Sequence, residues 1–106
     1  MFDALEMSLV VLERLAPVEA RIRQKSRSLA SQIADASESI VLNLGEGRAR
    51  TAGDRRRHYE FAAGSAGEVT VALRAALAKR YITATDRASV EEPLDRVRAM
   101  LYRLLH

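Results

Sequence analysis

The 106-residue sequence contains no cysteine and no tryptophan, and only five of its residues are aromatic. Without cysteine, the chain has neither a disulfide framework nor a thiolate metal site. No uninterrupted apolar run approaches the roughly 18 residues of a membrane span, and the N-terminus lacks the basic segment and cleavage site of a secretory signal. We therefore expect a cytoplasmic protein that has no membrane partner.

The side-chain patterns of common enzymes are also missing. The two histidines, His58 and His106, do not form a ligand pair at helical spacing, and no Glu-x-x-His sequence offers a di-iron site. Ser65 stands in a Gly-Ser-Ala-Gly context, but no strand is predicted before it and no base is identifiable, so a nucleophile elbow is not indicated. We therefore expect no catalytic residue, no metal and no cofactor.

Apolar residues recur every three or four positions in four segments, and no segment has the two-residue period of a strand. The length and the 48% apolar content fit a single domain, residues 1–106. The predicted fold class is all-α, an antiparallel up-down-up-down four-helix bundle. The predicted helices cover about residues 3–25 with a kink at Pro17, 27–44, 54–80 and 87–105. Whether the first segment is one bent helix or two is left open by the sequence.

The stretch from Ser39 to Gly47 reads as a largely apolar helical segment, and the polar residue Asn43 falls on its apolar line. A buried amide without a partner costs about 1–3 kcal/mol, so we expect Asn43 to bond to something specific. We interpret Asn43 and Glu46 as an internal hydrogen-bonded device that fixes helix register or a subunit contact. Gly45 and Gly47 are expected to end the helix, since glycine tolerates the backbone of a helix C-terminus.

Small residues and a candidate cap mark the third predicted helix. Gly64 and Ser65 lie in a run of small residues that is unfavourable for helix propensity, and we interpret them as packing residues that allow another backbone to approach. Asp54 is the expected N-cap.

Positive charge is concentrated rather than spread evenly. The chain has 17 Lys and Arg against 14 Asp and Glu, yet residues 48–57 alone carry five arginines and one aspartate. The predicted nucleic-acid-binding residues are Arg48, Arg50, Arg55, Arg56 and Arg57. Three of them would occupy the first turn of a helix, where the helix dipole disfavours cations, which favours an external anion such as phosphate.

A second basic segment, residues 21–27, has charges on more than one helix face and is interpreted as a solvated helix end. The run at 48–57 also has a plain alternative, a solvated arginine-rich turn, and the sequence does not decide between the two. Apart from Tyr59 the run has no aromatic neighbours, so stacking on single-stranded bases is poorly supported.

The order and spacing of several short motifs resemble a known family, the 23S rRNA intervening-sequence proteins, also called S23 ribosomal-like proteins. This four-helix-bundle family is related to the accessory variability determinant of diversity-generating retroelements. The resemblance covers roughly residues 5–105, although Leu44-Gly45 stands where an Ile-Ala pair is frequent in the family. The matching motifs are Gln32-Ile33, Ser39-Ile40, Asn43, Glu46-Gly47, Arg48 or Arg50, Phe61, Ala63-Gly-Ser65, Glu68, Leu73 and Tyr81-Ile82.

The resemblance implies that copies of the chain assemble into a homopentameric ring. It also implies a nucleic-acid-binding scaffold, with RNA or DNA as ligand and a reverse transcriptase as a possible protein partner. Two functions follow as hypotheses: phosphate binding through the arginine run, or a ring that offers apolar faces to a partner enzyme and uses its arginines for solubility or ion pairs. A third possibility is a passenger of a selfish element with no host function.

Overall fold

A computed structural model describes residues 3–106 and contains four α-helices and no strand in that range. The helices are α1 (Ala4–Lys25), α2 (Arg27–Ala49), α3 (Ala52–Ala78) and α4 (Ala84–Leu105). The predicted all-α class with four helices is confirmed. The predicted domain also includes residues 1 and 2, which lie outside the described part of the chain.

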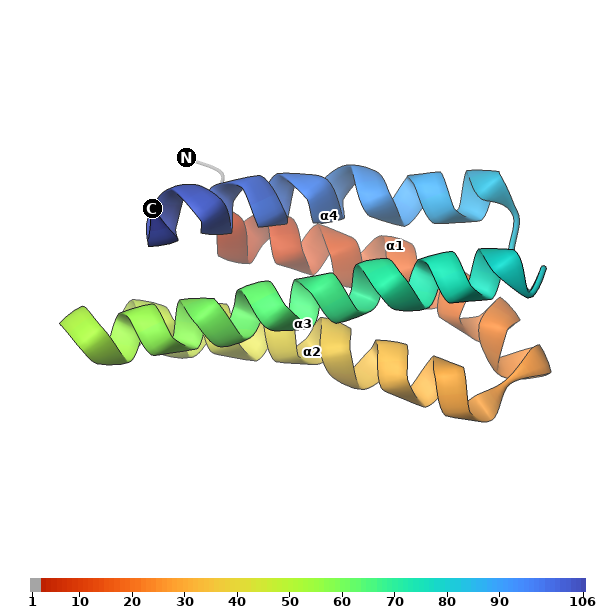
Figure 1. Ribbon diagram of the computed structural model, residues 1–106, viewed down its shortest axis with the longest axis horizontal. Coiled ribbons are helices and arrows are strands. Elements are labelled where there is room, and N and C mark those ends of the chain that lie inside the picture. Colours follow the sequence, from red (N-terminus) through yellow and green to blue (C-terminus); the bar gives the residue numbers. More distant parts are fainter. Residues whose placement is uncertain (1–2) are drawn as a thin grey trace.

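Each helix packs against two neighbours: α2 contacts α1 and α3, while α4 contacts α1 and α3. Figure 1 shows the start of α1, the end of α4 and the α2–α3 connection at one end of the molecule, and the α1–α2 and α3–α4 connections at the other. We call the first of these the basic end, because it carries residues 48–57. Within the described residues, none of the helices is long and apolar enough to cross a membrane.

The four apolar faces meet along the length of the molecule. Apolar burial of this kind contributes roughly 25 cal/mol for each square ångström removed from water, so these side chains hold the helices together. The core includes Val11 and Ile22 from α1, Ile33 and Ile40 from α2, Val69 and Leu73 from α3, and Leu94 and Val97 from α4.

The α1 helix is continuous through Pro17, which answers the question that the sequence left open. Proline lacks the N–H that would reach the carbonyl of Glu13. Both residues are exposed, so water can bond to that carbonyl. Asp3 caps the start of α1, and Ser26 lies between α1 and α2, with its hydroxyl accepting a hydrogen bond from the first turn of α2.

Several predicted helix ends differ from the structure. The α2 helix passes the expected end at Leu44 and continues through both glycines to Ala49, because glycine permits a helix end without requiring one. No glycine in the described residues has a positive φ. The α3 helix begins at Ala52, so that Asp54 lies in the first turn and is not the N-cap.

The α4 helix begins before the predicted residue 87, at Ala84, because Thr83 and Asp86 form a capping box. The Thr83 hydroxyl accepts from the Asp86 backbone N–H at 3.1 Å, and the Asp86 carboxylate accepts from the Thr83 N–H at 3.0 Å. These two bonds satisfy backbone donors that the start of a helix otherwise leaves free.

Candidate nucleic-acid interface

A chain of four hydrogen-bonded side chains joins α2 to α3 near the basic end. Ser65 Oγ donates to Ser39 Oγ at 2.8 Å, and Asn43 Nδ2 donates to the Ser39 carbonyl at 2.9 Å and to its hydroxyl at 3.1 Å. His58 Nδ1 lies 2.9 Å from Asn43 Oδ1. Since an amide oxygen only accepts, His58 donates from Nδ1 in this bond. We call these residues the polar chain.

The partner of Asn43 is therefore His58 and not Glu46. Glu46 is exposed and accepts from Arg50 at 3.1 Å, so Asn43 and Glu46 do not bond to each other within the chain, and their role in a subunit contact stays a prediction. Residues four apart, such as Ser39 and Asn43, share a helix face. That spacing was a signal for the first half of the polar chain, whereas the position of His58 depends on how α3 is aligned with α2.

Gly47 is buried in the last turns of α2, where it faces the ring of Tyr59 on α3. A Cβ added at Gly47 would lie 2.7 Å from Cδ1 of Tyr59 and closer still to Cε1, which is well inside van der Waals contact. Gly64 differs, because it is exposed and a Cβ there would meet no atom within 4 Å. Ser65 is buried and belongs to the polar chain.

Two arginines of the basic run bond to the ends of neighbouring helices. Arg55 Nε donates to the carbonyls of Gly47 and Arg50, both at 3.1 Å, and Arg56 Nη1 donates to the carbonyl of Leu105 at 2.8 Å. These carbonyls stand at the C-terminal ends of α2 and α4, which carry partial negative charge. The sequence did not reveal this structural reason for cations in the first turn of α3.

The other three arginines of the run pair with carboxylates. Arg48 lies 3.2 Å from Asp3, Arg57 lies 3.1 Å from Asp54, and Arg50 contacts both Glu46 and Asp54. All these side chains are substantially exposed, and pairs of this kind typically contribute about 0–1 kcal/mol.

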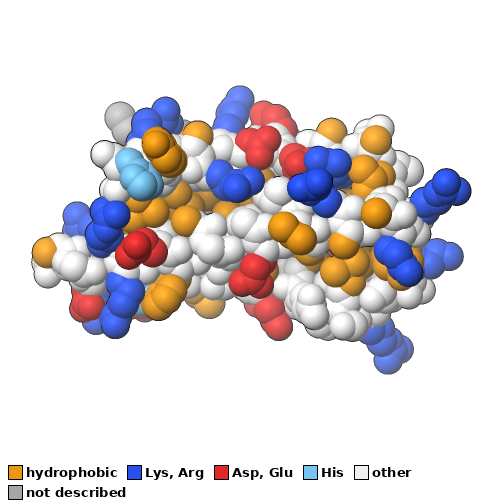
Figure 2. All heavy atoms as spheres, in the orientation of Figure 1, with side chains coloured by type: hydrophobic (Ala, Val, Ile, Leu, Met, Phe, Trp, Pro, Cys, Tyr) orange, Lys and Arg blue, Asp and Glu red, His pale blue; other side chains and the backbone are white. Residues whose placement is uncertain are grey.

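The basic end therefore keeps an excess of positive charge. Three of the five arginines pair with three carboxylates, and Arg55 and Arg56 have no carboxylate partner among residues 3–106. Figure 2 shows Lys and Arg side chains at both ends of the face it presents and also along its middle, among hydrophobic and acidic side chains. Chemically, this end offers guanidinium groups to an anion.

Together, the fold and the site define a small all-α protein with an arginine-rich surface beside a polar contact between α2 and α3. Residues 4–103 match the family described as 23S rRNA-intervening sequence protein. The chain belongs to this family, and the resemblance carried by the sequence motifs is confirmed. The comparison with curated proteins found no match, and the comparison with solved structures found none either.

Proposed function

We propose that this protein is a non-catalytic, cytoplasmic protein that binds RNA or DNA phosphates through Arg48, Arg50, Arg55, Arg56 and Arg57. The observation that carries the proposal is the excess charge at the basic end, where Arg55 and Arg56 have no carboxylate partner among the described residues. A phosphate replaces an exposed carboxylate at little cost, because the existing pairs are weak. Counterion release then favours binding to a polyanion. The family description names the intervening sequence of 23S rRNA, which supports a role connected with rRNA.

The proposal includes assembly of antiparallel up-down-up-down bundles into a homopentameric ring, as the resemblance implies. The alternating positions of the helix connections in Figure 1 support that topology. Assembly is supported by exposed apolar side chains on α2 and α3: Leu42 is 68% exposed, Phe61 54% and Val71 64%. The open space at Gly64 gives a second chain room to approach. A ring would repeat the arginine surface and so raise the overall affinity for a polyanion.

A second candidate function is a scaffold ring that binds a protein partner, such as a reverse transcriptase, without contacting nucleic acid. The ion pair between Arg50 and Glu46 favours it, since arginines engaged within the chain serve structure and solubility. The exposed apolar side chains of α2 and α3 would then face the partner.

A binding titration with two triple variants separates the candidates. We expect fluorescence anisotropy of a labelled RNA to show binding at low salt, and Arg55→Gln/Arg56→Gln/Arg57→Gln to weaken it. The matched control, Arg23→Gln/Lys25→Gln/Arg27→Gln, removes the same charge from exposed residues at the opposite end and should bind like the wild type. Absence of binding at low salt, or equal losses in both variants, would refute phosphate binding at the basic end. The first of these results favours the scaffold.

A further inference from the structure

An aromatic groove lies between α3 and α4 at the basic end. It has a volume of about 200 Å³ and is lined by Ala63, Arg98, Tyr102, Leu105 and His106. The Tyr102 side chain is 65% exposed, and its ring stacks on His106 with 4.4 Å between ring centroids and 29° between planes. The groove therefore holds a solvent-facing aromatic ring whose orientation is set by a second ring.

Two arginines without carboxylate partners among residues 3–106 flank this groove. Arg98 lines it and donates from Nη1 to the Thr70 hydroxyl at 3.3 Å. Arg56, in the first turn of α3, lies beside the groove and not in its lining, and it donates to the carbonyl of the lining residue Leu105 at 2.8 Å. The groove thus combines an accessible ring with cations on two helices.

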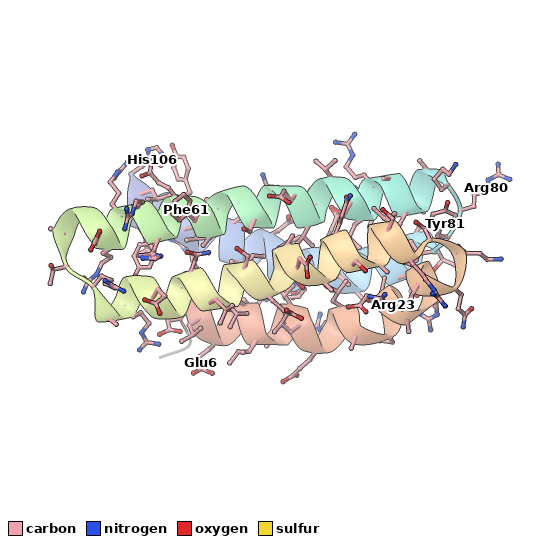
Figure 3. All side chains as sticks on the ribbon, turned by 90° about the horizontal axis from the view of Figure 1, so that it is seen from below. Glu6, Arg23, Phe61, Arg80, Tyr81 and His106 are labelled. Carbon is pink, nitrogen blue, oxygen red and sulfur yellow. The ribbon has the colours of Figure 1, made fainter. Side chains whose placement is uncertain are left out.

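The fold brings this ring to the arginines from a distant part of the sequence. Figure 3 places His106 and Phe61 at the same end of the molecule, with Arg23 and Arg80 at the opposite end. Tyr102 lies in the last turns of α4, and its ring stacks on that of His106, the residue that caps the helix. In space, α4 adds Tyr102 to the surroundings of the arginine run, because Arg56 bonds to the carbonyl of Leu105, which lines the same groove as Tyr102.

We propose that this groove binds single-stranded nucleic acid, with a base stacked on Tyr102 and with Arg56 and Arg98 on the adjacent phosphates. Sites that combine a basic groove with exposed aromatic rings bind single strands in this way, since every base has a face to stack. The bases of a duplex already stack on each other and are not free to do so. This inference rests on the proposed phosphate binding and adds that the nucleic acid bound there is single-stranded.

Two oligonucleotides and two variants test the stacking directly. The probes are a labelled oligothymidylate of about 12 nucleotides, within the usual site sizes for single strands, and an abasic strand of the same length. Tyr102→Leu should weaken binding of the thymidylate by about five-fold to a hundred-fold, the range measured for one stacked base. Tyr102→Phe keeps the ring and should bind like the wild type. All three proteins should bind the abasic strand equally, because its phosphates are unchanged.

The other outcomes separate this inference from the proposed function. If Tyr102→Leu binds the thymidylate as the wild type does, while the triple variant at residues 55–57 loses both strands, stacking is refuted and phosphate binding stands. If Tyr102→Leu weakens both strands equally, or if Tyr102→Phe fails as Tyr102→Leu does, the ring is not a stacking platform. If the wild type binds neither strand, both proposals fail.

Discussion

At the scale of single residues, Gly47 and Asn43 show how α2 and α3 are held together at the basic end. Gly47 allows the ring of Tyr59 to lie directly against the α2 backbone, and Asn43 connects Ser39 on its own helix to His58 on the other. The contact at Gly47 depends on the absence of a side chain, and the contact at Asn43 depends on an amide side chain that both donates and accepts hydrogen bonds. Each leads to a separate stability prediction.

Gly47→Ala should destabilise the fold by about 1–3 kcal/mol, the usual cost of forcing an extra methyl group into a packed contact. Gly45→Ala is the matched control in the same part of α2, because its Cβ would meet no atom within 4 Å. Replacing glycine by alanine at such an open helical position should stabilise by about 0.5–1 kcal/mol. Urea unfolding measures the free energy of unfolding of both variants. Equal values would contradict a close contact between residue 47 and the ring of Tyr59.

Asn43→Ala should lower the free energy of unfolding by about 1–3 kcal/mol, because it leaves polar groups of Ser39 and His58 without their partner. His58→Ala removes one of the same bonds. Because both substitutions remove the bond between Asn43 and His58, the double variant should lose less free energy of unfolding than the two single variants together, by about 0.5 kcal/mol or more. Additive losses in this double-mutant cycle would show that the bond between Asn43 and His58 contributes nothing measurable.

At the scale of helices, side chains and turns at the helix ends decide where each element stops. Arg55 and Arg56 on α3 bond to the terminal carbonyls of α2 and α4, so the start of one helix closes the ends of two others. The α3 helix ends differently, in a Schellman motif: the Tyr81 N–H bonds to the Ala76 carbonyl and the Arg80 N–H to that of Leu77, both at 2.9 Å.

Arg80 has φ of 60° in this motif, in the left-handed region that favours glycine. Arg80→Gly should therefore raise the free energy of unfolding by about 0.5–1 kcal/mol, since relief of backbone strain outweighs the greater freedom of the unfolded chain. Lys79→Gly is the control, because Lys79 has φ of −80° and gains nothing from glycine. A shift of the urea midpoint that is the same in both variants would rule out strain at Arg80.

The sequence predicted elements better than it predicted contacts between them. The apolar lines through Ile33 and Ile40 depend only on spacing within one helix, so the number of helices and their approximate extents were predictable. The true end of α2 was not, because Gly45 tolerates either a helix or a turn. The bonds from His58 to Asn43 and from Arg56 to Leu105 depend on the alignment of two helices, which periodicity does not contain.

At the scale of the whole molecule, surface side chains decide what the fold associates with. The apolar side chains on α2 and α3 are far from fully buried in the single chain, and self-association would remove them from water. Positive charge at the basic end and aromatic rings from α4 form a second, chemically different surface. In our proposal the first surface joins subunits and the second binds nucleic acid.

Leu42→Asp should lower the mass of the assembly measured by light scattering at micromolar concentration, because it places a charge on the proposed contact surface. The side chain is 68% exposed in the single chain, so folding should be unaffected, as circular dichroism would show. Leu104→Asp, at a 52% exposed position on α4, is the control and should leave the mass unchanged. A wild-type protein that is monomeric at this concentration would contradict assembly.

The central claim is that arginines at the basic end bind phosphates, and the salt dependence of binding tests it most directly. For the wild type and a single-stranded RNA, the logarithm of the affinity should fall linearly with the logarithm of salt concentration, with a slope of about −0.7 for each phosphate neutralised. The triple variant Arg55→Gln/Arg56→Gln/Arg57→Gln should show a shallower slope, while the triple variant at residues 23, 25 and 27 keeps the wild-type slope. Equal slopes in all three proteins would contradict the claim.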